Sequence, residues 1–225
     1  MQNLDINIAR AVIMIICFIP AIVLHELGHG YVAFKMGDTT AKAAGRLTLN
    51  PIKHIDPFGT VLLPVMLAIT GMPVFGYAKP VPYNPGRFKN IKKGEVLTGL
   101  AGPAVNLILA LLTSGIVWLL LSFLPASITG SQGFGWVYTG LYFFVLINLV
   151  LMFFNLLPIP PLDGSSIIMP FIPRKYLPTW YKVQRYAMPI LLVVVILVPM
   201  ILRINPLGIY LDATAGNLTN LIFPS

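Results

Sequence analysis

The chain alternates long hydrophobic runs with shorter polar and basic segments. Four runs have the length of about 20 residues that a helix needs to cross a bilayer. They cover residues 8–34, 95–124, 134–157 and 186–202. A fifth run, residues 58–72, is shorter and is interrupted by proline and glycine. This pattern predicts an all-α polytopic membrane protein with about four transmembrane helices and one re-entrant or interfacial segment.

The same pattern predicts one integral membrane domain, residues 1–225. We expect a first helix at 8–36, short edge strands and the re-entrant run within 37–94, and two further helices at 95–124 and 134–157. A proline-rich loop at 158–173 and a last helix at 184–204 follow. The first run has the look of a secretion signal, but no small-residue cleavage pattern follows it. We therefore expect it to be retained.

Composition agrees with a membrane environment. The chain is 57% hydrophobic and 10% charged, whereas soluble domains are about a quarter charged. The net charge of +8 could suggest nucleic acid, but the basic residues lie in the loops between hydrophobic runs, so we expect no nucleic-acid partner. The single cysteine, Cys17, allows neither a disulfide framework nor a thiolate metal site.

The basic loops predict the orientation of the chain, because cytoplasmic loops of membrane proteins are enriched in Lys and Arg. Basic residues occur in 35–53, 79–93 and 174–185, and the 122–135 loop has none. If the three basic loops are cytoplasmic, the long runs alternate correctly only when the short run 58–72 enters and leaves on the same side. A re-entrant hairpin or an interfacial segment does this.

Near the end of the first run, residues 25–29 read His-Glu-Leu-Gly-His. Positions four apart share a helix face, so His25 and His29 can each offer one ring nitrogen to a single metal ion. Glu26 then lies beside the ion without binding it, where a general base would take a proton from water. Ionisable groups inside a membrane span are costly and indicate function. The alternative, a polar cap at the helix end, requires no such spacing.

Residues 155–164 supply the next candidates. Three prolines in four positions end a helix here, and irregular backbone at membrane depth requires surrounding protein or a water-filled cavity. Of the seven acidic residues, Asp163 is the one left in a position to be a third metal ligand; a helix N-cap is the alternative. Asn155, in apolar surroundings, could donate a hydrogen bond to a developing oxyanion.

Other polar positions keep more than one interpretation. His54 and Asp56 lie in a loop with lysine and proline, where a solvated or headgroup-facing role is simpler than a catalytic one. Asn106 ends a patch of small residues that predicts a helix contact. Residues 46–49 and 74–83 could form edge strands that hold an extended peptide beside the site, with interfacial loops as the alternative.

Three motifs together resemble the site-2 protease family of intramembrane zinc metalloproteases. They are H-E-L-G-H at 25–29, G-P-A-V-N at 102–106 and N-L-L-P-I-P-P-L-D-G at 155–164. These motifs span most of the chain, and their combination is specific. The compact chain looks like the small stand-alone bacterial members of the family.

The resemblance implies one Zn²⁺ per chain on His25, His29 and Asp163, with Glu26 as the base and Asn155 near the scissile carbonyl. It implies a bacterial cell membrane and cleavage within or next to transmembrane segments of protein substrates, for signalling or for clearing membrane remnants. The basic loops, rather than the resemblance, predict an active site nearer the cytoplasmic face. A metal-ion transporter and a non-catalytic relative that binds membrane peptides are the competing functions. A transporter usually contains two related halves, and the histidine pair has no second copy.

Overall fold

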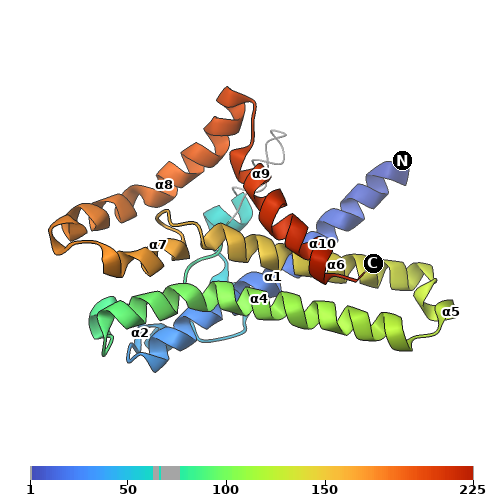
Figure 1. Ribbon diagram of the computed structural model, residues 1–225, viewed down its shortest axis with the longest axis horizontal. Coiled ribbons are helices and arrows are strands. Elements are labelled where there is room, and N and C mark those ends of the chain that lie inside the picture. Colours follow the sequence, from blue (N-terminus) through green and yellow to red (C-terminus); the bar gives the residue numbers. More distant parts are fainter. Residues whose placement is uncertain (1, 63–65, 67–76, 225) are drawn as a thin grey trace.

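The computed structural model describes residues 2–62, 66 and 77–224. Three long helices, α1 (Gln2–Lys35), α4 (Ile91–Phe123) and α6 (Gln132–Asn155), pack against one another (Figure 1). Among the described residues, these three are apolar and long enough to cross a membrane, and α8 (Leu177–Leu202) makes a fourth if its two bent halves form one span. The predicted all-α membrane fold is therefore confirmed.

Shorter helical elements connect the long ones. They are α2 (Thr40–Ala43), η1 (Pro51–His54), η2 (Pro57–Leu62), η3 (Pro85–Arg87), α5 (Ala126–Thr129), α7 (Asp163–Ile168), η4 (Met169–Phe171) and η5 (Arg174–Tyr176). After α8 the chain forms α9 (Pro206–Leu211), η6 (Asp212–Gly216) and α10 (Asn217–Ile222). In Figure 1 the end of α1, the start of α4 and α7 lie toward the same end of the molecule.

Local sequence explains where the long helices begin. The Oδ1 of Asn90 accepts a hydrogen bond from the N–H of Lys93 at the start of α4 (3.0 Å). The Oγ of Ser131 accepts one from the N–H of Phe134 at the start of α6 (3.2 Å). Each side chain satisfies a backbone donor that has no partner inside its helix.

Proline explains where helices stop or bend. The three prolines between 158 and 161 follow directly after the end of α6. Helix α8 bends by 58° between Gln184 and Tyr186. The bend lies one turn before Pro189, whose ring cannot fit against the carbonyl of the preceding turn.

Small residues let α1 and α4 approach closely. A methyl group on Gly28 would lie 3.1 Å from the carbonyl oxygen of Ala101 and 2.9 Å from a methyl of Val105. Beyond this crossing, a buried apolar cluster joins α4 and α6 to the C-terminal helices. Its buried members are Ala110, Val117, Val145, Leu149, Met152, Ala215 and Phe223. The packed bundle is the rigid support on which the polar residues of α1 lie.

The C-terminal helices were not predicted, because residues 206–222 form no long hydrophobic run. Local signals are nevertheless present. The Oδ1 of Asn205 accepts a hydrogen bond from Gly208 N–H (2.9 Å), with Pro206 at the first helical position. The segment packs on α6, where the Tyr210 hydroxyl donates to the carbonyl of Phe153 (3.2 Å).

The expected edge strands are wrong for the described residues. Residue 46 has no regular structure, residues 47–49 lie in a bend, and residues 77–83 form neither helix nor strand. Residues 74–76 and most of the run expected to be re-entrant, 58–72, lie outside the described residues. The first residues of that run belong to the helical turn η2.

Residues 77–83, here called the strap, show why no ladder forms. The N–H of Lys79 donates to the carbonyl of His54 (2.9 Å), and the Arg46 guanidinium donates to the carbonyl of Lys79 (2.7 Å). The two prolines of the strap have no N–H to contribute. Separate hydrogen bonds, one of them from a buried arginine, therefore hold the strap beside α1.

Candidate metal centre

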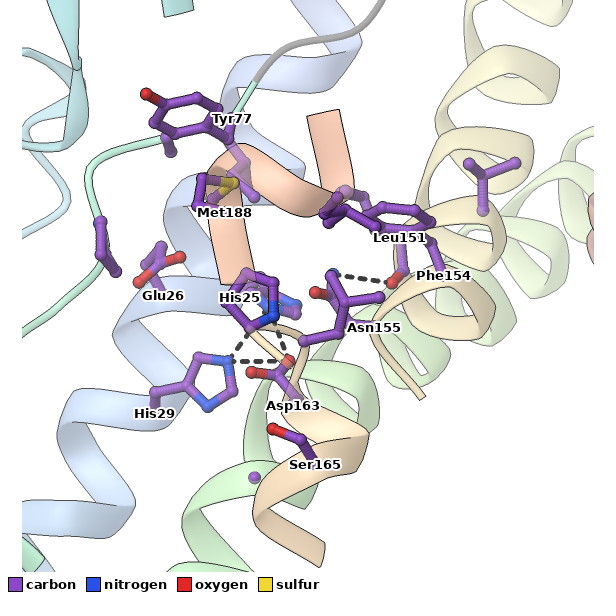
Figure 2. A pocket seen from close by; sticks show the side chains of 18 of the residues that line it. His25, Glu26, His29, Tyr77, Leu151, Phe154, Asn155, Asp163, Ser165 and Met188 are labelled. Atoms are coloured by element: carbon purple, nitrogen blue, oxygen red, sulfur yellow. Dashed lines mark hydrogen bonds and ion pairs between the residues drawn. The ribbon is translucent and has the colours of Figure 1, made fainter. Parts of the chain in front are cut away.

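The three predicted ligands lie together in the structure (Figure 2). The Nε2 atoms of His25 and His29 are 3.0 Å apart, and each is 3.2 Å from the Oδ2 of Asp163. Both imidazoles are buried, with exposed fractions of 2% and 7%. Across the described ranges this is the one group of three or more His, Cys, Asp or Glu side chains close enough to share an ion.

The local structure explains this convergence. His25 and His29 are one turn apart on α1, so their rings lie on the same face. The proline turn after α6 delivers Asp163 as the first residue of α7. Leu162 occupies the cap position of that helix, and no side chain makes a capping bond there. The carboxylate points to the histidines instead, so the capping alternative does not describe Asp163.

Hydrogen bonds from α4 determine which imidazole nitrogens face the centre. The Nδ1 of His29 lies 2.7 Å from the carbonyl oxygen of Thr98, and the Nδ1 of His25 lies 2.6 Å from the Oδ1 of Asn106. A carbonyl oxygen only accepts, so each Nδ1 carries the proton. Both Nε2 atoms then present lone pairs to the same point.

This donor set fits a zinc ion. With both protons on Nδ1, the buried Oδ2 of Asp163 receives no hydrogen bond and faces two further acceptors, the Nε2 atoms of His25 and His29. Three acceptors so close together repel one another unless a cation lies between them. A tetrahedral zinc ion bound at about 2.0–2.1 Å would place its ligands roughly 3.3 Å apart, close to the separations observed.

Gly102 provides space for the two rings. An added methyl group on this residue of α4 would collide with the Nε2 of His29 and with the imidazole of His25. Without a side chain at this position, the helix backbone lies directly against both ligands. The small-residue patch predicted as a helix contact is therefore also part of the metal centre.

Glu26 lies beside the ligands and is held by the strap. Its Oε2 accepts a hydrogen bond from the N–H of Val81 (2.7 Å). The side chain is buried, with an exposed fraction of 9%, and lines the same cavity as the ligands. Because the anchor uses Oε2, the carboxylate keeps Oε1 for a second interaction.

Asn155, the last residue of α6, also lines this cavity. Its Nδ2 donates to the carbonyl of Leu151 (3.0 Å), and Figure 2 shows its side chain near Asp163. An amide nitrogen has two protons, so one N–H remains for a substrate oxygen.

His54 and Asp56 do not join the centre. The Nε2 of His54 lies 2.9 Å from the carbonyl oxygen of Thr48, and the Oδ1 of Asp56 accepts from Gly59 N–H (2.7 Å). His54 is almost fully buried, with an exposed fraction of 2%. The expectation of a solvated histidine is therefore wrong, and both side chains stabilise the loop that holds the strap.

A cavity of about 580 Å³ extends from the metal centre between the three-helix bundle and the α8–α9 segment. Away from the centre its lining is largely apolar. Representative lining residues are Phe18, Ile22, Leu151, Phe154, Met188 and Leu191. The ligands and Glu26 therefore lie at one end of a hydrophobic space.

Several groups that shape the centre were missed from the sequence. The carbonyl of Thr98 and the N–H of Val81 are main-chain groups. The type of a residue does not indicate which of its main-chain groups faces a site, so neither contact had a signal in the sequence. Asn148 gave a usable signal, because it is a polar residue inside the apolar run 134–157.

Known proteins resemble this chain closely. The model of peptidase family M50 matches residues 131–198. The putative zinc metalloprotease YwhC of Bacillus subtilis is 40% identical over 201 residues, covering 88% of this chain and 82% of that protein. The zinc metalloprotease MJ0392 of Methanocaldococcus jannaschii is 33% identical over 171 residues, covering 76% of this chain and 37% of that protein. No solved structure gives a significant match.

The family match lies on the part of the chain that includes α6, the proline turn and Asp163. The Bacillus relative is similar over most of both chains. These similarities agree with the motif resemblance found in the sequence. The chain belongs to peptidase family M50, the site-2 protease family.

Proposed function

We propose that this protein is a zinc metalloendopeptidase that hydrolyses peptide bonds within or next to transmembrane segments of membrane proteins. One observation carries the proposal: two imidazole nitrogens and one carboxylate oxygen converge, buried, at the end of an apolar cavity. The relatives named zinc metalloproteases support both the metal and the reaction.

His25, His29 and Asp163 would hold the ion, which supplies Lewis-acid chemistry to a carbonyl and to water. Glu26 acts as the general base and then passes its proton to the leaving amine. Val81 N–H holds one oxygen of this carboxylate, so its position does not depend on the substrate. The second N–H of Asn155 donates to the oxyanion that develops at the scissile carbonyl.

The apolar cavity favours substrates that are themselves apolar. A peptide bond inside a helix is shielded by the helix's own hydrogen bonds, so the substrate must unwind locally before it reacts. The strap lies beside Glu26 and has no regular secondary structure, and we propose that an unwound substrate pairs with its main chain. This substrate class fits either regulated proteolysis of membrane proteins or the clearance of membrane remnants.

We also infer that the protein lies in a bacterial cell membrane with the site nearer the cytoplasmic face. Exposed lysines gather at the end of α1 and at the start of α4, and the opposite 122–135 loop has no charge. At 1.5 Å per residue, His25 and His29 lie roughly 10–15 Å inside the basic end of α1. The positive-inside rule then assigns that end to the cytoplasm.

Glu26→Gln tests the proposal directly. The variant keeps a side chain that accepts from Val81 N–H but loses the base, so we expect zinc to stay bound and cleavage to fall at least about 100-fold. Zinc content by atomic emission and cleavage of a membrane-peptide substrate in detergent give the two measurements.

Asp212→Asn, which alters an exposed carboxylate on the C-terminal segment, is the matched control and should match wild type in both measurements. Cleavage by Glu26→Gln within a few-fold of wild type would contradict the assignment. Metal uptake into proteoliposomes by a wild-type protein that cleaves no peptide would favour a transporter instead.

A further inference from the structure

We infer that Asn148 is a positioning residue that sets the tautomer of His25 from the neighbouring helix α6. It makes no hydrogen bond to either histidine and acts through Asn106. The inference rests on the proposed zinc function, but it is tested on the metal-free protein.

The hydrogen bonds that link Asn148 through Asn106 to His25, here called the relay, begin at a main-chain carbonyl. Asn148 is completely buried, and its Nδ2 donates to the carbonyl oxygen of Phe144 on the same helix (2.8 Å). That oxygen only accepts, so the amide of Asn148 has one favourable orientation, with Oδ1 turned away from Phe144. A buried amide in the reverse orientation would place two acceptors against each other.

Asn106 transmits this orientation to α4. It is also completely buried, and its Nδ2 donates to the Oδ1 of Asn148 (2.8 Å) and more weakly to the carbonyl of Ala21 (3.4 Å). Both partners only accept, so the nitrogen of the Asn106 amide must face them. Its Oδ1 therefore faces His25.

The last step fixes the imidazole. The Nδ1 of His25 lies 2.6 Å from this Oδ1 and must carry the proton, which leaves the Nε2 lone pair for the metal. If the Asn106 amide turned over, its nitrogen would donate to Nδ1. The proton would then move to Nε2 and block the metal position.

The two histidines differ in this respect. The Nδ1 of His29 donates to the main-chain carbonyl of Thr98, which cannot turn over. The His25 tautomer depends instead on two side-chain amides from two other helices. Changing Asn148 should therefore affect His25 and leave His29 unchanged, so each protein sample contains its own control.

Asn148→Leu removes the acceptor while keeping a side chain of similar size. In the metal-free protein labelled with ¹⁵N-histidine, the chain has three histidines to resolve. We expect the Nδ1 of His25 to lose its proton wholly or partly while His29 keeps Nδ1–H. Zinc affinity, measured by competition with a chelator, should fall about 10–100-fold.

Two further variants separate the relay from general loss of packing. Asn148→Asp retains an acceptor for Asn106 and should keep the His25 proton on Nδ1. Thr113→Val removes a buried hydroxyl about two turns beyond Asn106 on α4. This variant should change neither the His25 tautomer nor the zinc affinity.

Unchanged His25 protonation in a folded Asn148→Leu protein would overturn the inference. So would a wild-type, metal-free protein in which the Nδ1 of His25 carries no proton, a measurement that requires no variant. Either result would leave the proposed protease function intact, because neither measures cleavage. Conversely, an inactive wild type with the expected tautomers would affect only the proposed function.

Discussion

At the scale of single residues, the metal centre depends on an absent side chain as much as on its ligands. Gly102 lets the backbone of α4 lie against both imidazole rings. The same helix contributes the carbonyl of Thr98 one turn before and Asn106 one turn after. One face of α4, at spacings of four residues, therefore supports the two histidines of α1.

Gly102→Ala should displace the histidine rings and weaken zinc binding. Overpacking of a rigid contact costs about 1–3 kcal/mol, which predicts a loss of roughly ten- to a hundredfold in affinity. Chelator competition on the purified protein measures it. Gly115→Ala on the same helix is the matched control, because an added methyl there has no neighbour within 4 Å. Equal zinc affinities for the two variants would contradict this account.

At the scale of elements, a buried carboxylate connects the end of α1 to the segment that follows the strap. The Oδ2 of Asp38 accepts from the N–H of Asn84 (2.6 Å), and its Oδ1 accepts from the backbone and hydroxyl of Thr40. Burial raises the pKa of this carboxyl, but these hydrogen bonds and the Arg87 guanidinium outweigh it and hold the pKa below its ordinary value. Asp38 therefore stabilises the fold as a carboxylate.

Asp38→Asn should lower the free energy of unfolding at neutral pH by about 1.5–3 kcal/mol, the range for hydrogen bonds to charged groups. Because the folded pKa is depressed, the wild-type advantage is complete above the unfolded pKa near 3.9 and is lost as pH falls through the folded value. Thermal unfolding of both proteins between pH 3 and 7 measures this. A difference that persists undiminished at low pH would show that the charge is not responsible.

At the scale of the whole molecule, basic residues are distributed unevenly along the long axis. The exposed lysines near α2 and at the start of α4 lie toward one end, and the uncharged α5 connection lies toward the other (Figure 1). The metal centre lies nearer the basic end, because His25 and His29 lie close to the C-terminal end of α1. Orientation in the membrane therefore decides which compartment supplies water to the reaction.

Single cysteines test this orientation, because the one native cysteine, Cys17, is buried. Lys92→Cys, at the basic end, should react with a membrane-impermeant maleimide only in inverted bacterial membrane vesicles. Ser127→Cys, in the uncharged connection, should react only in right-side-out vesicles. Wild-type protein gives the background, and the reverse labelling pattern would refute the cytoplasmic placement.

The periodicity of the chain was enough to predict the long helices, since apolar length and proline breaks act locally. It could not predict the 206–222 helices, which are short and packed against α6. It also suggested edge strands at 46–49, where apolar and polar residues alternate, and at 74–83, with interfacial loops as the alternative. In the described part of those segments, Arg46 and the prolines of the strap replace a ladder with separate hydrogen bonds.

The sequence by itself determined the membrane class and the family. It also identified His25, Glu26, His29 and Asp163 as candidate site residues, because helix spacing and the cost of burying charge depend on residues that are close in the sequence. Only the tertiary structure decided that Asp163 meets the histidines, that Val81 holds Glu26, and that Asn106 and Asn148 orient His25. These contacts join positions 42 to 138 residues apart, since Asn106 to Asn148 is the shortest separation and His25 to Asp163 the longest. They depend on how helices pack, and no local pattern specifies that packing.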